Sequence, residues 1–330
     1  MAAGNTEFLN ATAFAADHVL NHNFLDVWTT AHPLVKVIKE NKVNFNKGVT
    51  RRENKAIIPI VYTGPSTAAD GKTDANSLTA ITPYALAGFT ASEWEYTRYE
   101  GAWYLRPHER ELLKNGSRGN LVQGAVLQLM GSFKEAVSGD LAGNSAAARE
   151  NLQGLRQALS ATNTVGGIDQ SDGSNGFWHA KLNTNGGTFD VGKVDDDYDN
   201  IATEGRGAPD LLMLSHNATV NLFGKMRDNV AAMQRINAPA KVAKFGFPSF
   251  EYMDMMCVLD NRLGAALSTT GGFMMLTSNS WYWSGDDKPT LLEDKCRLEG
   301  TGAYEYYYEW WTMLGCSDMA LNAYRNGFTG

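Results

Sequence analysis

The spacing of apolar residues predicts one long helix near the middle of the chain. Apolar residues recur there at steps of three and four, namely Val122, Val126, Leu129, Phe133 and Val137. This is the period of an amphipathic α-helix, and a helix over 119–140 would be about 33 Å long. Gly124, Gly131 and Gly139 each weaken it by about 1 kcal/mol relative to alanine. We therefore expect packing to hold this helix and to require those small residues.

Short β-branched, aromatic or apolar segments predict strands on both sides of the helix. They cover 55–62, 89–104, 210–214, 247–259 and 274–277, and a closing pair covers 304–311 and 318–325. In the first strand of the closing pair, Tyr304, Tyr306, Tyr308 and Trp310 share one face. Gly315 is expected to turn the chain into the last strand.

Two segments are expected to be unstable on their own. Residues 6–40 show the apolar spacing of one or two amphipathic helices, and a polar stretch follows over 41–54. The stretch 63–83 is too polar to form a core and too long for a tight hairpin. We expect an N-terminal arm and a long two-stranded excursion with a mobile tip, supported by something outside this chain.

The sequence of the middle region predicts a long loop followed by alternating helices and strands. Residues 160–190 are rich in Gly, Asn, Thr and Ser, which indicates a long irregular loop. A helix over 195–203 that begins with acidic residues, and a helix over 217–233, then alternate with the strand at 210–214. Helices and strands together favour an α+β fold.

Composition places the chain among globular proteins. Of 330 residues 43% are hydrophobic, and 29 basic against 36 acidic side chains give a net charge of −7. The size predicts two domains or one large elaborated domain. No apolar run approaches the roughly 18 residues that span a bilayer, and the N-terminus lacks the pattern of a signal peptide. We therefore expect a chain that is neither membrane-spanning nor secreted by that route.

The cysteine count and the charge add two further expectations. Three cysteines without a metal-binding spacing indicate buried free thiols in a reducing cytoplasm. The acidic balance argues against tight, sequence-independent binding of nucleic acid over most of the surface, because phosphate contacts need clustered Lys and Arg.

Candidate catalytic and metal-binding motifs are weak. The acidic tract 195–200 begins like a calcium loop, but Asn200 replaces the turn glycine and Arg206 replaces the closing glutamate. His18 and His22 have a spacing that suits a metal, although a solvated helix face explains them better. No nucleophile elbow, P-loop lysine or Cys-x-x-Cys occurs. We expect no enzymatic activity, no metal and no cofactor.

Aromatic residues near the C-terminus favour a protein contact. Trp310 and Trp311 point to opposite faces of one predicted strand, so both faces must be covered or one must meet a partner. A contact between subunits is the favoured interpretation. The alternative is a carbohydrate-active or sugar-binding protein that uses Glu305 and Glu309. Their Cα atoms would lie roughly 13 Å apart on a strand, too far for direct cooperation.

Several short motifs occur in a characteristic order. They are Asn115-Gly116 before the long helix, Gly166-Gly167-Ile168-Asp169 followed by Phe177-Trp178, Pro209-Asp210-Leu211-Leu212 before a strand, and Phe245-Gly246-Phe247 with Asp260. With the closing strand pair, this order resembles the major capsid proteins of tailed phages, which have the Hong Kong 97 shell fold. The resemblance covers nearly the whole chain.

The resemblance implies a division of the chain into five segments. They are an N-terminal arm at 1–54, an extended loop at 55–104, a peripheral domain with the spine helix at 105–145, an axial domain at 146–275, and a return to the peripheral domain with the terminal strands at 276–330. The arm and the loop would each lie on adjacent subunits.

The resemblance also implies a function and partners. The chain would be a structural subunit that self-assembles as hexamers and pentamers into the icosahedral shell around the double-stranded DNA of a tailed phage. It would belong to the virion capsid and assemble in the host cytoplasm, away from membranes. Separate scaffolding and portal proteins are implied partners, with a decoration protein as a further option, and packaged DNA would be bound without sequence specificity. A cargo-enclosing nanocompartment of the same fold is the close alternative.

Candidate subunit-interface residues come from the loop and the aromatic segments. They are Asp70, Lys72, Trp94, Tyr96, Arg98, Trp178, Trp310 and Trp311. In some members of the family a loop lysine forms an isopeptide crosslink to an asparagine of a neighbour, and Lys72 lies near the inferred loop tip. Lysine is also common on exposed tips, so both interpretations of Lys72 stay open.

Overall fold

The structure, a computed structural model, describes most of the chain outside its N-terminal segment. The described residues are 37, 50–52, 54–62, 89–106, 118–144, 146–148, 150–184, 187–203, 207–215, 218, 249–259, 271–286, 290–291 and 304–329. Most of the predicted arm, the predicted loop tip and the helix expected at 217–233, apart from Ala218, lie outside these ranges. So do Asp70, Lys72, His18, His22, Cys296, Asn115, Gly116, Phe245, Gly246, Phe247 and Asp260.

The described helices and strands alternate irregularly along the chain. The helices are α4 (Arg118–Ala142), α5 (Leu155–Ala158) and α6 (Val191–Ala202), with 3-10 turns η1 (Gly173–Trp178), η3 (Ser278–Ser280) and η4 (Met319–Leu321). The strands are β1 (Thr50–Arg52), β2 (Lys55–Val61), β3 (Phe89–Glu95), β4 (Thr97–Leu105), β5 (Thr164–Val165), β6 (Ile168–Asp169), β7 (Lys181–Asn183), β8 (Gly187–Thr188), β9 (Leu211–Leu214), β10 (Ser249–Tyr252), β11 (Met255–Leu259), β12 (Gly272–Leu276), β13 (Trp281–Gly285), β14 (Thr290–Leu291), β15 (Tyr304–Cys316), β16 (Ala323–Asn326) and β17 (Phe328–Thr329).

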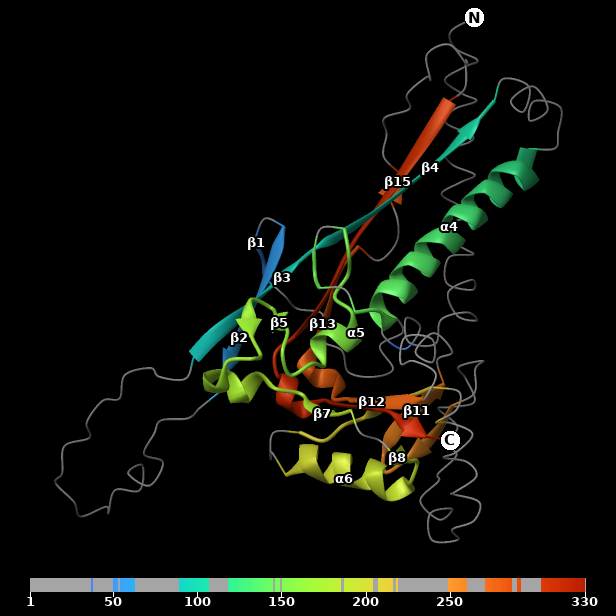
Figure 1. Ribbon diagram of the computed structural model, residues 1–330. Helices are drawn as coiled ribbons and strands as arrows, with labels where there is room; N and C mark the ends of the chain where they lie inside the picture. Colours follow the sequence, from blue (N-terminus) through green and yellow to red (C-terminus); the bar gives the residue numbers. More distant parts are fainter. Residues whose placement is uncertain are drawn as a thin grey trace, which may run out of the picture.

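The long strand β15 organises the elongated part of the molecule (Figure 1). Its residues 304–312 pair antiparallel with 97–105 of β4, and its other edge pairs with β13 and β14. Helix α4 runs alongside this ribbon (Figure 1). The Tyr99 hydroxyl donates to the Asp140 carboxylate of the helix at 2.6 Å. A side chain at Gly101 would clash with Leu129, so glycine at this position lets the helix approach closely.

The second part of the molecule is a mixed six-stranded sheet in the order β10-β11-β9-β12-β16-β7. Every residue of the central strands β9 and β12 is buried, as expected for strands covered on both faces. Helix α6 packs on this sheet, where Val194 and Ile201 belong to the same buried cluster as Leu212, Leu214 and Phe273.

Buried polar contacts attach the C-terminal segment to both parts. Arg325 of β16 forms a bidentate ion pair with Asp197 of α6, with N–O distances of 2.6 and 2.7 Å. The Asn322 side-chain oxygen accepts from the Thr277 backbone N–H at 3.0 Å and from the Trp281 indole at 2.8 Å. Because each of these buried groups has a partner, burying them does not carry the penalty of an unmade hydrogen bond.

Trp94 of β3 fastens the β2–β3 hairpin to the body. Its side chain is fully buried, and its indole N–H donates to Ser92 Oγ at 2.8 Å, which donates to the Cys316 carbonyl at 3.3 Å. A Cβ would lie 3.1 Å from the Trp94 ring at Gly166, where φ is +59°, and 3.0 Å at Gly315. This chain therefore supports the base of the excursion, which corrects the expectation that its support comes from outside.

The structure confirms the main predicted elements. Helix α4 covers the predicted span 119–140 and continues one or two residues past each end. Strand β2 matches the prediction at 55–62 and β9 matches 210–214. The apolar stretch 247–259 forms the hairpin of β10 and β11.

Other boundaries differ for physical reasons. The strand expected over 89–104 is two strands, because the chain passes at Tyr96 from the β2–β3 ladder, which ends at Glu95, to the β4–β15 ladder, which begins at Thr97. Strand β15 continues through Gly315 instead of turning there, and the closing strand is reduced to β16 after the turn η4. The loop expected at 160–190 contains the short strands β5 to β8 and the turn η1.

The acidic tract lies inside helix α6 rather than at its start. The helix begins at Val191, and Asp190 caps it by accepting from the Gly192 N–H at 3.3 Å. Within the helix, Asp195 accepts from the Tyr252 hydroxyl at 2.6 Å, and Asp197 pairs with Arg325. These carboxylates therefore anchor the helix to its sheet. Among the described residues, no three His, Cys, Asp or Glu side chains form a group that could hold a metal ion.

Packing among the described residues does not explain the glycines of α4. A Cβ at Gly124, Gly131 or Gly139 would meet none of their atoms within 4 Å beyond the chain neighbours and the backbone of the helix itself. The expectation that packing requires these small residues is therefore wrong for the single chain. Of the helices that the structure describes, none is both long and apolar enough to cross a bilayer.

Two of the cysteines are free and buried, as predicted. They are Cys257 and Cys316. Burial raises the pKa of the Cys316 thiol to about 12, so the reactive thiolate does not form near neutral pH.

Replacing Trp94 tests the anchor of the hairpin. We expect Trp94→Ala to lower the free energy of unfolding by about 3 to 5 kcal/mol, because the change leaves a large cavity between two glycines. Tyr104→Ala is the matched control, since Tyr104 is 50% exposed and its removal should cost well under 1 kcal/mol. Thermal unfolding of the unassembled chain measures both, and equal losses would contradict the anchor.

Lys134 of α4 should give folding a distinctive pH dependence. Its side chain is 3% exposed, and burial lowers its pKa to about 8, whereas an unfolded lysine titrates near about 10.4. Between these values the unfolded chain binds a proton that the folded chain lacks, so stability rises with pH. Lys134→Met should remove this rise, whereas Lys55→Met, at an exposed lysine, should keep it. Identical pH profiles for the wild type and Lys134→Met would refute the assignment.

Candidate functional site

The ribbon of β4 and β15 has one face that belongs to the protein core. Tyr99 and Trp103 of β4 and Tyr306, Tyr308 and Trp310 of β15 are each no more than 8% exposed. The rings of Trp103 and Tyr306 stack with centroids 4.4 Å apart. Because Tyr99 and the neighbouring Gly101 contact α4, this is the face that the helix covers.

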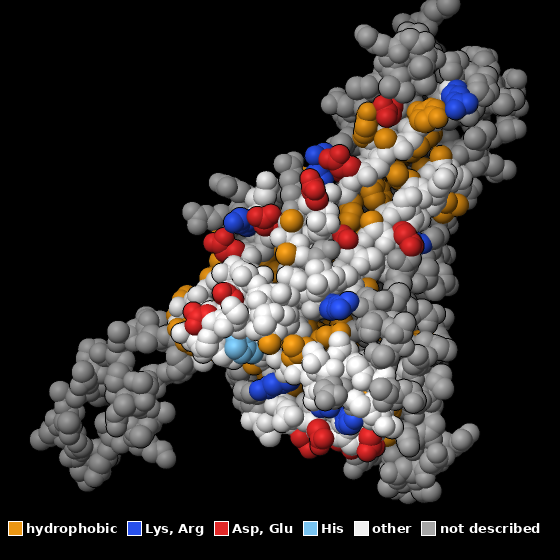
Figure 2. Space-filling model, viewed as in Figure 1, with side chains coloured by type: hydrophobic (Ala, Val, Ile, Leu, Met, Phe, Trp, Pro, Cys, Tyr) orange, Lys and Arg blue, Asp and Glu red, His pale blue; other side chains and the backbone are white. Residues whose placement is uncertain are grey.

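The opposite face of the ribbon is partly open in the single chain. This far face consists of Arg98, Glu100, Ala102 and Tyr104 of β4 and Glu305, Tyr307, Glu309 and Trp311 of β15. All eight residues are exposed or partly exposed. Figure 2 shows charged side chains of both signs beside apolar ones over the ribbon. With three glutamates to one arginine, the far face is acidic and aromatic.

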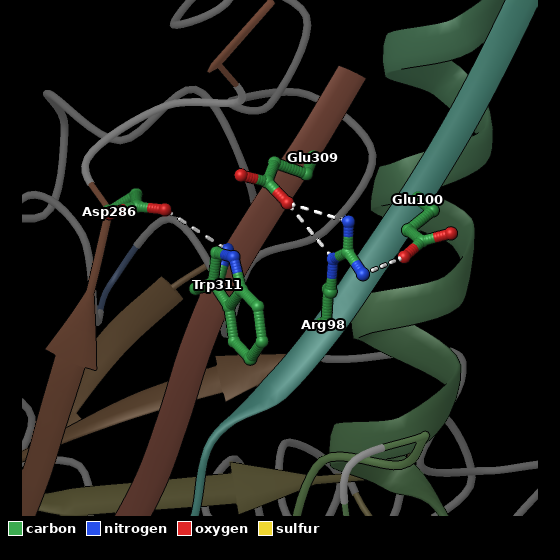
Figure 3. A network of polar contacts seen from close by, with 5 residues as sticks. All are labelled: Arg98, Glu100, Asp286, Glu309 and Trp311. Carbon is green, nitrogen blue, oxygen red and sulfur yellow. Dashed lines mark hydrogen bonds and ion pairs between the residues drawn. The ribbon is translucent and has the colours of Figure 1, made fainter. Parts of the chain in front are cut away.

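Arg98 holds the two strands together across the far face (Figure 3). The register places Glu100 directly opposite Glu309, and like charges in such a pair repel. The Arg98 guanidinium lies 2.9 Å from a Glu309 carboxylate oxygen and 2.5 Å from one of Glu100. The Glu309 side chain is 20% exposed and that of Glu100 is 58% exposed. Solvent therefore weakens the Arg98–Glu100 pair more than the Arg98–Glu309 pair.

Trp311 and Asp286 extend this network toward β13 (Figure 3). The Arg98 guanidinium carbon lies 5.5 Å from the centre of the Trp311 ring, a distance typical of a cation–π contact. The Asp286 carboxylate accepts from the backbone N–H of Trp311 at 3.2 Å, and the backbone N–H of Asp286 donates to the Trp311 carbonyl at 2.8 Å. The Asp286 carbonyl also accepts from the Trp310 indole at 2.7 Å. Asp286 thus holds β15 in place through hydrogen bonds to two consecutive residues, Trp310 and Trp311.

The structure places four of the predicted interface residues in the core. Trp94, Trp178 and Trp310 are fully buried in the single chain, and Tyr96 is 3% exposed. The Trp178 indole donates to the Val165 carbonyl at 3.0 Å. A side chain that is already covered has no surface left to bury against a neighbour, so these four residues are core residues and their assignment to an interface is corrected.

Of the other four predicted interface residues, two remain candidates and two lie outside the described residues. Arg98 and Trp311 meet on the far face, where both are partly exposed. Asp70 and Lys72 lie outside the described residues. Sequence reasoning missed Glu100 and Asp286, because their roles follow from the register between β4, β15 and β13. The alternation of Glu93 and Glu95 with apolar residues does not extend to Glu100, so no signal in the sequence pointed toward it.

The arrangement gives no support to acid–base catalysis by Glu305 and Glu309. Both residues lie on the far face, as the alternation predicts, but the Glu309 carboxylate is occupied by Arg98. The far face therefore offers charge and aromatic surface for binding rather than a pair of carboxylates converging on a substrate.

Solved structures that are similar to this chain include capsid proteins. The chain is similar to a protein of the Cyanophage A-1(L) capsid asymmetric unit, with a TM-score of 0.60 and 12% identity over 88% of this chain and 93% of that chain. The capsid of a native GTA particle gives a TM-score of 0.55 and 10% identity over 88% and 90%. A structure from Mycobacterium phage Bobi gives 0.54 and 10% identity over 92% of each chain.

These similarities show the fold of the chain. No protein-family model matches the sequence, and no curated protein sequence matches it significantly. The chain has the α+β fold of phage capsid proteins, which confirms at the level of the fold the resemblance drawn from its motifs. The proteins it resembles in structure are shell components, not enzymes.

Removing Arg98 should expose the repulsion between Glu100 and Glu309. We expect Arg98→Met to lower the free energy of unfolding by about 1 kcal/mol at low salt, because the network is partly exposed. The loss should shrink in 1 M salt, where the Debye length is about 3 Å. Arg98→Lys, which keeps the charge without the planar fork, should lose less. Thermal unfolding at two salt concentrations measures this, and a salt-independent loss would show that packing alone is involved.

Proposed function

We propose that this chain is the major capsid protein of a tailed phage, a structural subunit with the Hong Kong 97 fold. The observation that carries the proposal is the similarity to capsid structures over 88% or more of the chain. The physical argument for assembly comes from what the single chain leaves uncovered.

The division of the chain follows from this proposal. Residues 1–54 form the arm and 55–104 the extended loop. Helix α4 lies in the peripheral domain at 105–145, to which 276–330 returns with β15. The six-stranded sheet and α6 belong mainly to the axial domain at 146–275. In this arrangement the segment 276–330 contacts the extended loop through the pairing of β15 with β4, and the axial domain through the pairing of β16 with β12.

Uncovered apolar residues at the base of the loop support contacts between copies. Val61 is 68% exposed, Phe89 is 55% exposed and Tyr62 is 38% exposed. Val61 and Phe89 face each other across the last register position of β2 and β3, so they form one patch. A specific interface buries about 1,600 Å² in total, and many weak contacts closed by symmetry suffice for a stable shell.

The proposal includes the wider assembly. The subunits form hexamers and pentamers of an icosahedral shell around double-stranded DNA, in a virion capsid that assembles in the host cytoplasm. Scaffolding and portal proteins, and a decoration protein if one is used, are separate chains. DNA is enclosed without sequence-specific contacts, and the net charge of −7 argues against its tight binding over most of the surface.

Electron microscopy and nuclease protection test the proposal. The purified chain, or the chain expressed in bacteria, should form closed particles of uniform size in negative stain, and particles from infected cells should contain nuclease-protected DNA. Particles that instead enclose a protein cargo would identify a nanocompartment of the same fold. A chain that remains a monomer under every assembly condition would overturn both.

A variant at the loop base makes the test specific. Phe89→Asp should reduce the yield of particles about tenfold or more, because it places a charge in an apolar contact. It should leave the melting temperature of the unassembled chain nearly unchanged, because the side chain is exposed there. Phe89→Leu keeps an apolar side chain and is the control. Full assembly of Phe89→Asp would exclude this patch from the subunit contacts.

A further inference from the structure

The charges of this chain are distributed unevenly. The segment 38–55 contains six basic residues, Lys39, Lys42, Lys47, Arg51, Arg52 and Lys55, and two acidic ones, Glu40 and Glu53. Its net charge is 6 − 2 = +4. The rest of the chain then has 29 − 6 = 23 basic and 36 − 2 = 34 acidic residues, or −11. Copies of such a chain repel each other unless basic segments meet acidic surfaces.

The far face is the acidic surface that the ribbon leaves open. Glu100 has a side chain that is 58% exposed, and Glu305 has no ion-pair partner in the part of the chain that the structure describes. Arg98, the one cation of this face, is already shared between Glu100 and Glu309. Arg106 stands at its end with its guanidinium 5.7 Å from the ring centre of Tyr104. With Asp286 and Arg106 included, this surface therefore has four carboxylates and two guanidinium groups.

We infer that the far face of one copy binds the basic segment 38–55 of a neighbouring copy. This inference rests on the proposed shell function and names one of its contacts. Charge complementarity supports this inference. The densest cluster of cations in the sequence would meet an acidic strand face whose arginine, Arg98, is already paired with Glu100 and Glu309. The exposed Tyr104 ring and the partly exposed Trp311 ring add surface on which lysine and arginine side chains pack.

The geometry makes this contact directional. Strand β1 and the first residue of β2 belong to the basic segment and lie in the hairpin, whereas the far face lies on the β4–β15 ribbon (Figure 1). The two surfaces are therefore different patches of one chain. A contact between different patches is heterologous, and such contacts form rings when the rotation between copies closes. A capsomer is a ring of this kind.

Charge reversal on each side tests the contact. The face variant combines Glu100→Lys with Glu305→Lys, which keeps the Arg98–Glu309 pair and places a lysine opposite Glu309. The segment variant combines Lys42→Glu with Lys47→Glu. Each variant alone brings like charges together, so each should raise the concentration needed for assembly about tenfold or more. Light scattering and negative-stain microscopy measure assembly.

Mixing the two variants separates a contact between copies from one within a chain. In the mixture, the lysine face of one variant meets the glutamate segment of the other, and the unchanged glutamate face meets the unchanged lysine segment. Co-assembly of the mixture, when neither variant assembles alone, is the expected result. A contact within one chain would stay mismatched in both variants, and the mixture would fail. Failure of the mixture overturns the inference.

The controls distinguish this inference from the shell proposal. Glu150→Lys with Asp196→Lys makes the same charge change at two exposed acids away from the far face, and it should assemble like the wild type. Thermal unfolding of each unassembled variant checks that it folds. If the wild type assembles and both variants assemble equally well, the contact is refuted while the shell stands. If the segment variant loses only protected DNA, the basic segment binds DNA and the contact is also refuted. A wild type that never assembles refutes both.

Discussion

The antiparallel pairing of β4 with β15 is the interaction on which the rest of the structure depends. It brings residues 97–105 next to 304–312, so segments about 200 positions apart in sequence form one ribbon. On one side of this ribbon the aromatic residues and Gly101 allow α4 to pack closely. On the other side, the same register sets Glu100 against Glu309 and gives Arg98 its bridging position. One register thus determines both the core and the open surface.

The sequence predicts local elements better than the contacts between them. The spacing of seven and four residues between Val126, Phe133 and Val137 was enough to find α4, because one face of that helix is buried. The break at Tyr96 could not be predicted, since it depends on where the chain changes its pairing partner from β2 to β15. The end of β15 was also missed. Gly315 usually signals a turn, but here it makes room for Trp94.

The candidate site shows the same limit. Strand alternation correctly separates the face of Trp310 from that of Trp311. Alternation alone cannot tell which aromatic residues a single chain covers by itself, and therefore Trp94, Trp178 and Trp310 were placed at an interface although they lie in the core. Their burial means that each copy folds around its own tryptophans. In the proposed shell, the described residues that remain for contacts between copies are the exposed apolar side chains at the hairpin base and the charges on the ribbon.

The length of β15 has a mechanical consequence. This thirteen-residue strand is held on one edge by β4 and on the other by β13 and β14, and its C-terminal end leads into the network around Asn322. Tension directed along the strand axis loads these ladder bonds in shear, so many of them must fail at the same moment. A pull across the strand would instead break them in succession. The ribbon is therefore stiffest along the direction in which it connects the two halves of the molecule.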